Sequence, residues 1–176
     1  MKNIENALVI LAGGNGSRFG KKLPKQFTQI NGENLIHFFL KRIDTNNFDK
    51  IVIVCKISYF KFFKKLEYDF PSVDFIYTKA GKDRQSSSFN GIKILKPFYP
   101  KKVLIHDAAR PFCSNNLIMK ILKNLKKNSS AIPYVVNADK KMILKKDFNK
   151  NIKLIQTPQG FKFQDIFEAH KKTLIK

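Results

Sequence analysis

The sequence predicts a single α/β domain in which helices cover both faces of a mostly parallel sheet. Two observations carry this prediction. Short, continuous apolar runs, typical of strands buried on both faces, alternate along the chain with segments of helical periodicity. The chain also has 176 residues, which suits one domain with a sizeable core. Strands and helices that alternate in this way fold into three layers, α/β/α.

The expected strands are short apolar runs without the polar alternation of a strand that has one wet face. The clearest is Ala7-Leu8-Val9-Ile10-Leu11, which precedes a glycine-rich turn. Similar runs occupy 50–55, 74–78 and 102–106, and a further strand-like run occupies 130–136. Because parallel strands bind ligands beyond their carboxyl ends, the loops that follow these runs are expected to form one rim.

Helices are expected where apolar residues recur three or four positions apart, as Phe89, Ile92 and Leu95 do. The expected helices cover 35–42, 59–68, 86–95, 116–127 and 163–174. The segment 138–155 is very basic and alternates only weakly. It is predicted to be a protruding β-arm within the one domain of residues 1–176.

The charge is strongly positive but carries little information about a partner. The formal net charge is +21, and nearly all of the excess comes from lysines scattered along the chain. Scattered charge lacks the geometry that follows a nucleic-acid groove, so a basic nucleic-acid-binding module is kept only as an alternative from another class. Arginine is scarce, and three of the four arginines (Arg18, Arg84 and Arg110) lie inside dense motifs, which indicates a need for the planar guanidinium there.

Composition also excludes some classes. No apolar run approaches the roughly 20 residues that span a bilayer, so a transmembrane protein is not expected. The N-terminus has no charged leader followed by an apolar core and a cleavage site, which argues against secretion. Cys55 and Cys113 are the only cysteines and cannot form a metal cluster alone. The expected compartment is the reducing cytoplasm.

A glycine-rich turn, LAGGNGSRFG, occupies 11–20 after the first strand. It lacks the Gly-Lys-Ser/Thr ending of a P-loop, and its glycine spacing is not that of a dinucleotide-binding fingerprint. Glycines let backbone N–H groups approach phosphate oxygens or a base edge, and Arg18 would add a fork for phosphate. Lys25, after a rigid proline, would deliver a point charge to a phosphate. The alternative is an ordinary turn with a surface arginine.

Two further loops carry polar residues at the same expected rim. HDAARP at 106–111 ends a buried strand, and Asp107 is placed where a carboxylate meets a metal–phosphate complex. Arg110 either contacts an anion or forms an internal salt bridge, and His106 is expected to be packed or hydrogen-bonded rather than catalytic. GKDRQSSS at 81–88 precedes a helix, and any of its serines could be the helix N-cap.

Together these motifs resemble one family. Five motifs occur along the chain in this order: LAGGNGSRFG, PKQF, GKDRQSS, HDAARPF and QTPQGF. The order is similar to that of the 2-C-methyl-D-erythritol 4-phosphate cytidylyltransferases of the non-mevalonate isoprenoid pathway. The resemblance covers residues 7 to about 172 and implies a Rossmann-like nucleotidyltransferase fold. The final motif and helix look most like the N-terminal half of bifunctional enzymes that also carry a cyclodiphosphate synthase.

The resemblance implies a reaction and its partners. The family transfers CMP from CTP to a polyol phosphate, with Mg²⁺ as cofactor, and releases pyrophosphate. The attacking phosphate is already ionised, so no general base is needed, and catalysis is positioning plus charge stabilisation. A homodimer in which the arm exchanges between subunits is implied as well.

The motifs also carry residue roles by resemblance. Arg18 and Lys25 are the expected catalytic residues, which would stabilise the α-phosphate and the leaving pyrophosphate. The expected nucleotide-binding residues are Ala12, Gly13, Gly14, Gly16, Gly81, Asp83, Ser87 and Asp107, and Asp107 is also the expected metal ligand. The expected acceptor-binding residues are Arg110, Asp139 and Lys140.

The sequence departs from the family pattern at several points. Gly13 stands where the family more often has Ala, Lys140 replaces a Thr, and Asn149 replaces an Arg. The last two changes lie on the acceptor side, so a ribitol-5-phosphate or other sugar or polyol-phosphate cytidylyltransferase stays open. The family's C-terminal phosphate-binding lysine has no counterpart before Lys176, which predicts either a fragment of a longer protein or a degenerate form.

Overall fold

The computed structural model describes residues 4–14, 28–136 and 153–174. Its centre is a six-stranded sheet in the order β5-β4-β1-β6-β10-β7. Four neighbouring strands run parallel: β1 (Asn6–Leu11), β4 (Lys50–Cys55), β5 (Phe75–Lys79) and β6 (Lys102–Asp107). Two short strands continue the sheet with antiparallel pairing: β10 (Gln159–Lys162) beside β6, and β7 (Ser130–Ala131) beside β10. The prediction of a mostly parallel sheet is confirmed.

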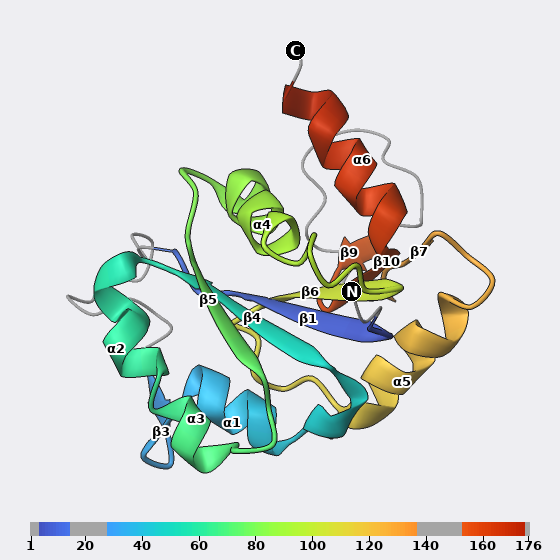
Figure 1. The fold of residues 1–176 in the computed structure, drawn as a ribbon. Coiled ribbons are helices and arrows are strands. Elements are labelled where there is room, and N and C mark those ends of the chain that lie inside the picture. Colours follow the sequence, from blue (N-terminus) through green and yellow to red (C-terminus); the bar gives the residue numbers. More distant parts are fainter. Residues whose placement is uncertain (1–3, 15–27, 137–152, 175–176) are drawn as a thin grey trace, which may run out of the picture.

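Helices cover both faces of this sheet, which gives the predicted three layers (Figure 1). One face carries α4 (Arg84–Lys93) and α6 (Phe163–Leu174). The other carries α1 (Leu35–Lys41), α2 (Phe60–Phe63), α3 (Leu66–Asp69) and α5 (Asn115–Asn124). Two short 3-10 helices, η3 (Thr45–Asn47) and η4 (Ile57–Tyr59), flank β4.

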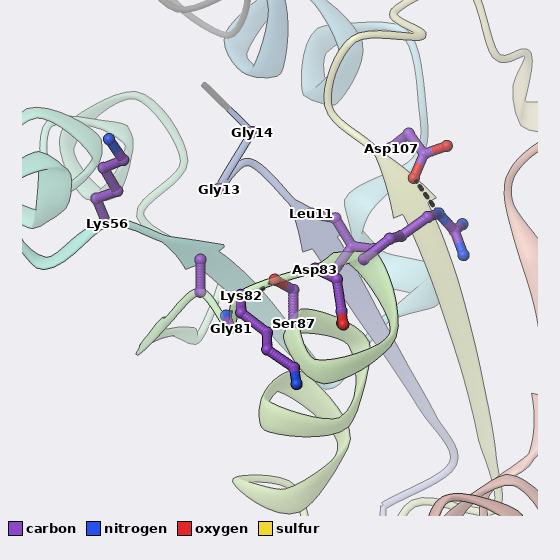
Figure 2. A pocket seen from close by; sticks show the side chains of 11 residues that line it. Leu11, Gly13, Gly14, Lys56, Gly81, Lys82, Asp83, Ser87 and Asp107 are labelled. Atoms are coloured by element: carbon purple, nitrogen blue, oxygen red, sulfur yellow. Dashed lines mark hydrogen bonds and ion pairs between the residues drawn. The ribbon is translucent and has the colours of Figure 1, made fainter. Parts of the chain in front are cut away.

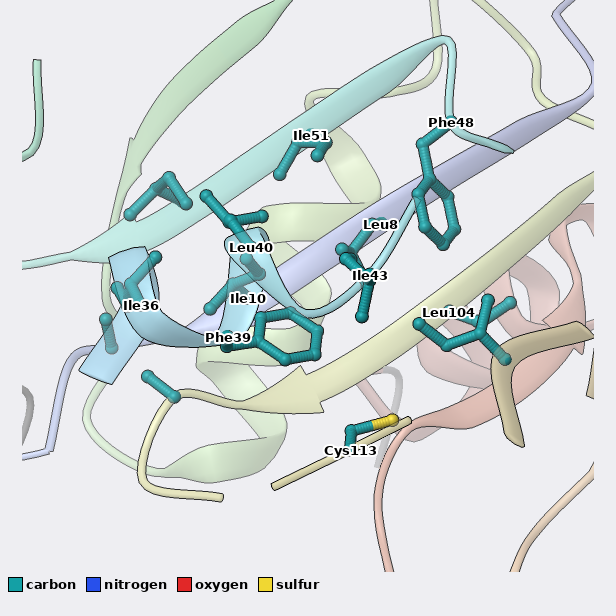
Figure 3. Close-up of a cluster of buried hydrophobic side chains, with 14 of the residues drawn as sticks. Leu8, Ile10, Ile36, Phe39, Leu40, Ile43, Phe48, Ile51, Leu104 and Cys113 are labelled. Atoms are coloured by element: carbon teal, nitrogen blue, oxygen red, sulfur yellow. The ribbon is translucent and has the colours of Figure 1, made fainter. Parts of the chain in front are cut away.

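The sheet has a hydrophobic core on each face because its central strands are apolar on both sides. In β1, Leu8 and Ile10 face one core, and Ala7 and Val9 face the other; all four are fully buried. Figure 3 shows the first core, where side chains of α1 such as Phe39 lie over β1. The alternation follows the two-residue period of a strand.

One glycine allows a helix to pack unusually close to the sheet. A Cβ added to Gly91 of α4 would lie 2.5 Å from Val9 Cγ1 and 2.8 Å from Val54 Cγ2. Since carbon atoms in contact are normally 3.5–4.0 Å apart, any side chain at this position would push the helix away. The close packing seats α4 over β1 and β4, with its first residues at the carboxyl edge of the strands.

Most elements match the sequence prediction, and the differences have local causes. The predicted helix at 59–68 is divided into η4, α2 and α3. The predicted strand at 130–136 is also divided: β7 joins the main sheet, whereas β8 (Tyr134–Val136) follows Pro133 and joins a separate ribbon. Proline lacks the N–H that a continuous central strand would need, which explains the division.

Two features were not predicted. β10 has a glycine within its four residues and no alternating pattern, so only its neighbours β6 and β7 identify it as a strand. The small hairpin of β2 (Gln29–Ile30) and β3 (Glu33–Asn34) turns through Asn31 and Gly32, which both have positive φ. An Asn-Gly pair is a strong signal for such a turn and could have revealed the hairpin.

The base of the predicted arm is an antiparallel ribbon in which β8 pairs with β9 (Lys153–Ile155). The rest of the predicted arm, 138–152, lies outside the described residues. Within the described ranges, no helix has both the length and the apolar composition that crossing a membrane requires.

Candidate active site

A pocket of about 540 Å³ opens at the carboxyl ends of the parallel strands. The residues that line it come from three places: the end of β1, the β5–α4 loop with the first turns of α4, and the ends of β4 and β6 (Figure 2). They are Leu11, Gly13, Gly14, Lys56, Ala80, Gly81, Lys82, Asp83, Arg84, Ser87 and Asp107. The three loops that the sequence placed on one rim therefore do meet.

The glycine turn leaves β1 in a fixed direction because strand-like hydrogen bonds continue past the end of the strand. The Ala12 N–H donates to the Val54 carbonyl at 2.7 Å, and the Ala108 N–H donates to the Leu11 carbonyl at 3.0 Å. Gly13 and Gly14 follow directly and face the pocket, where Gly14 is exposed. The backbone of both residues is thus open to a ligand.

The β5–α4 loop is shaped by a capping box at the start of α4. The Asp83 carboxylate accepts the Ser86 N–H and the Ser86 hydroxyl, each at 2.7 Å, and the Asp83 N–H donates to Ser86 Oγ at 3.1 Å. The bond from the Ser86 backbone is the main reason that the pKa of Asp83 lies below its ordinary value. The N-cap is therefore Asp83 and not one of the serines, which corrects the sequence interpretation.

Ser87 and Gly81 form the floor of the pocket. Ser87 is buried, and its hydroxyl accepts the Gly81 N–H at 2.9 Å. A Cβ on Gly81 would lie 2.2 Å from Ser86 Oγ, so the capping box leaves room only for glycine. The loop that the motif GKDRQSS predicted is thus held open by its own hydrogen bonds.

Asp107, the last residue of β6, binds two arginines. Its Oδ1 accepts from Arg84 Nε at 3.0 Å, and its Oδ2 lies 3.6 Å from Arg110 Nε. Arg84 also donates to Gln159 of β10 at 3.3 Å, and Arg110 donates to Gln156. The internal salt bridge foreseen for Arg110 is therefore present. Arg110 itself does not line the pocket. It lies next to Asp107, which does.

The pocket favours anions. Lys56, Lys82 and Arg84 line it, and its two carboxylates, Asp83 and Asp107, already have hydrogen-bonded partners. Oriented N–H groups near glycines and a surplus of cations are the features that hold phosphate oxygens. Among the described residues, no cluster of three or more His, Cys, Asp or Glu side chains is arranged for a metal ion.

His106 is a buried residue that supports the site through hydrogen bonds to Arg110 and Thr157. It is fully buried, and burial lowers its pKa to about 4, so the ring is neutral. Nε2 lies 3.1 Å from the Arg110 carbonyl, which can only accept, so Nε2 carries the proton and Nδ1 accepts from the Thr157 hydroxyl at 3.2 Å. Thr157 Oγ1 in turn accepts the Asp107 N–H at 3.3 Å. His106 is packed and hydrogen-bonded, as predicted.

Comparison with known proteins decides the family. Residues 6–176 match the family model of 2-C-methyl-D-erythritol 4-phosphate cytidylyltransferase. The chain belongs to this family. Its members are cytidylyltransferases, a class of nucleotidyltransferase.

Two relatives illustrate how much of each protein is matched. The chain is 38% identical over 171 residues to a bifunctional enzyme IspD/IspF of Pelagibacter ubique, covering 94% of this chain and 45% of that one. It is 32% identical over 176 residues to a 2-C-methyl-D-erythritol 4-phosphate cytidylyltransferase of Thermotoga neapolitana, covering 95% and 77%. The chain thus spans less than half of the bifunctional relative and about three quarters of the other.

Solved structures agree on the fold. The 4-diphosphocytidyl-2C-methyl-D-erythritol synthase of Anaerococcus prevotii aligns with a TM-score of 0.83 at 26% identity, covering 98% of this chain and 76% of that chain. The bifunctional IspDF of Campylobacter jejuni aligns with a TM-score of 0.78 at 30% identity, covering 96% and 43%. The nucleotidyltransferase fold expected from the motifs is confirmed.

Only part of the predicted cytidylyltransferase site lies within the residues that the structure describes. Gly13, Gly14, Gly81, Asp83, Ser87 and Asp107 line one pocket, and Ala12 is buried directly behind it. Gly16, Arg18, Lys25, Asp139 and Lys140 lie outside the described residues. Lys56, Ala80, Lys82 and Arg84 line the pocket but were not predicted. The scarcity of arginine pointed to Arg84, and the strand-end rule could have found Lys56, which follows β4.

Proposed function

We propose that this chain transfers CMP from CTP to 2-C-methyl-D-erythritol 4-phosphate and releases pyrophosphate. The observation that carries the proposal is the anion-favouring pocket at the strand ends, in a chain that belongs to this family. A phosphate oxygen of the acceptor attacks the α-phosphorus of CTP, a new P–O bond forms, and the bond to the β-phosphate oxygen breaks. Both substrates are ionised at neutral pH, so the reaction needs no base from the protein.

The nucleotide half of the site is assigned to the pocket. Ala12, Gly13, Gly14 and Gly16 would surround the triphosphate, and Gly81, Asp83 and Ser87 would lie near the cytosine and ribose. Arg18 and Lys25 would neutralise charge that develops on the α-phosphate and pyrophosphate. The pocket has the volume and the cations for such a ligand, which supports the assignment.

The acceptor half is assigned to the side where Arg110 lies. Arg110 is exposed and is oriented by Asp107 and Gln156, so its guanidinium is positioned to meet a phosphate. Asp139 and Lys140 would complete this half. Lys140 and Asn149, two of the residues that depart from the family pattern, also belong here, so a ribitol 5-phosphate acceptor is the second candidate.

Magnesium fits the residues present as an ion that arrives with CTP. Asp107 lines the pocket with one carboxylate, whose oxygens now face Arg84 and Arg110, and Mg²⁺ is usually held by one or two carboxylates together with substrate phosphates and waters. Asp107 would hold the ion, which would neutralise charge on the phosphate oxygens. We also propose a homodimer formed through the arm, and a cytoplasmic location. The location is supported by Cys55 and Cys113, which are free, buried thiols.

The assay that tests the proposal is pyrophosphate release from CTP and Mg²⁺, with methylerythritol 4-phosphate in one reaction and ribitol 5-phosphate in another. Release with the first acceptor alone is expected.

Arg18→Ala should lower the rate by about a hundredfold or more, because a charged contact made in the transition state is lost. The control is Arg42→Ala, which removes the exposed C-cap arginine of α1, outside the pocket, and should leave the rate unchanged. Release with ribitol 5-phosphate instead would change the acceptor, and salt-dependent DNA or RNA binding without any release would favour the nucleic-acid alternative.

A further inference from the structure

Gly13 has no conformational reason to be glycine. Among the described glycines, only Gly32 has a φ in the left-handed region. The backbone at Gly13 is therefore one that alanine could adopt. What excludes a side chain must be a neighbouring atom rather than the turn itself.

That neighbour is the methyl group of Ala80, on the loop across the pocket floor. A Cβ on Gly13 would lie 2.2 Å from Ala80 Cβ and 3.6 Å from Ala80 Cα. Two methyl groups cannot occupy this space, since carbon atoms in contact lie about 3.5–4.0 Å apart. One methyl group fits between the two segments, and in this chain Ala80 supplies it.

Neither segment can easily move apart to make room. The Ala80 N–H donates to the Cys55 carbonyl at 2.9 Å, and the Ala12 N–H donates to the Val54 carbonyl at 2.7 Å. Both segments are thus fastened to the end of β4, whose residues Val54 and Cys55 are fully buried. The contact between Gly13 and Ala80 is therefore fixed from both sides.

We propose that Ala80 is a positioning residue of the nucleotide pocket, whose methyl group sets the distance between the glycine turn and the β5–α4 loop. Both residues line the pocket, so this distance determines how the backbone of the two loops meets a ligand. The identity of that ligand as CTP rests on the proposed function. The methyl group can be moved: alanine at 13 with glycine at 80 should fill the same space.

The test is a cycle of Gly13→Ala, Ala80→Gly and the double variant in the full chain. CTP affinity is measured by calorimetry with Mg²⁺, and melting temperature and steady-state kinetics are measured for each protein. Gly13→Ala should raise the dissociation constant for CTP by about tenfold or more, because overpacking displaces one loop. The double variant should return to within about threefold of the starting protein. KM for CTP should follow this pattern, whereas kcat should change less.

Gly91→Ala is the matched control because it adds the same methyl group against Val9 and Val54 and not against Ala80. Combining it with Ala80→Gly should give no recovery. Rescue of Gly13→Ala by Ala80→Gly, without rescue of Gly91→Ala, supports the proposal even if Gly13→Ala alone does not fold. CTP affinity unchanged in Gly13→Ala, or a double variant no better than Gly13→Ala, would overturn it.

If the proposed function is wrong, the measured affinities and melting temperatures would show a different pattern. If the starting protein itself did not bind CTP, the melting temperatures would still report on the pair. Recovery of the melting temperature in the double variant would then support the Gly13–Ala80 spacing while removing CTP as the ligand. Absence of recovery would remove both.

Discussion

Asp107 is the residue on which the charges of the site converge. Arg84 and Arg110 approach separate oxygens of its carboxylate, and Arg84 also reaches Gln159. One planar guanidinium thereby joins the first residue of α4 to β6 and β10. An ammonium group cannot donate in two fixed directions from one plane, so lysine is not an equivalent of arginine here.

Arg84→Lys is expected to lower kcat/KM by about tenfold, and Arg84→Ala by more, because Asp107 loses a charged hydrogen bond and its fixed orientation. Pyrophosphate release measures the effect, and the melting temperature separates it from misfolding. Arg42→Ala serves as the control, since Arg42 is exposed and contacts the Phe38 ring instead. Unchanged kcat/KM in Arg84→Ala would show that Asp107 does not need this partner.

The two cysteines give a prediction about reactivity. Burial raises the pKa of the Cys55 thiol to about 12 and that of Cys113 to about 11, so neither forms appreciable thiolate at pH 8. Iodoacetamide should therefore label neither in the native protein and both in guanidinium chloride, as read by mass spectrometry. Ser72→Cys, at an exposed position, is the positive control and should be labelled without denaturant. Rapid native labelling of Cys55 would mean that the carboxyl end of β4 opens.

Sequence patterns located single residues well only where a motif was dense. Gly81 and Ser87 were predicted from the resemblance of their motif to the family, and Asp107 also from its place at a strand end; all three line the pocket. Lys56 was missed because one lysine among so many carries no signal by its residue type; only its place directly after β4 marks it. The serines were considered as the N-cap and Asp83 was not, since only the geometry of the turn decides between neighbouring cap residues.

At the scale of elements, the spacing of apolar residues predicted the strands and helices whose side chains form the core. The runs at 50–55 and 102–106 became β4 and β6, and 163–174 became α6 with the same bounds. The failures were short elements, such as β10, that take their conformation from strands already in place. Local sequence alone could not specify them, because their hydrogen bonds come from distant parts of the chain.

Two glycines that allow close packing give an ordered pair of stability effects. A Cβ on Gly91 meets γ-methyl groups of Val9 and Val54, whereas a Cβ on Gly160 of β10 meets Ile121 Cγ2 at 2.4 Å and Leu125 Cδ1 at 2.9 Å. Both contacts of Gly91 are with γ-methyl groups of stiff, β-branched valines in central strands. At Gly160 only Ile121 is stiff in this way, because the Leu125 end can turn aside. We expect Gly91→Ala to lower the free energy of unfolding by about 2 kcal/mol and Gly160→Ala by less. Urea denaturation measures both, and the reverse order would contradict this account of the α4 packing.

At the scale of the whole molecule, the net charge and the apolar surface indicate different things. The charge of +21 belongs to a scattered lysine surface, and the cations that matter are those that line one pocket. Exposed apolar side chains occur at several places, but four of them form one group. Tyr134, Val135, Leu154 and Ile155 are each about half exposed, and all lie on the β8–β9 ribbon.

Each face of this ribbon carries one apolar cross-strand pair. Val135 is paired with Leu154, and Tyr134 with Ile155, so each pair lies on its own face. A two-stranded ribbon is marginally stable in water, and no described residue covers either pair enough to bury it. A second copy of the chain would bury them, which is the physical basis for the proposed homodimer.

The prediction is that the protein sediments as a dimer and that Val135→Asp with Leu154→Asp shifts it to the monomer. Charges placed on one face of the ribbon would have to lose water in the interface, at a cost of several kcal/mol. Sedimentation velocity over a range of concentrations measures the shift. Tyr68→Asp is the control, because Tyr68 of α3 is 88% exposed but lies far from the ribbon in the fold, so the dimer should persist. A monomer at high concentration in the starting protein would refute the dimer, and loss of the dimer in Tyr68→Asp would move the interface to the α3 side.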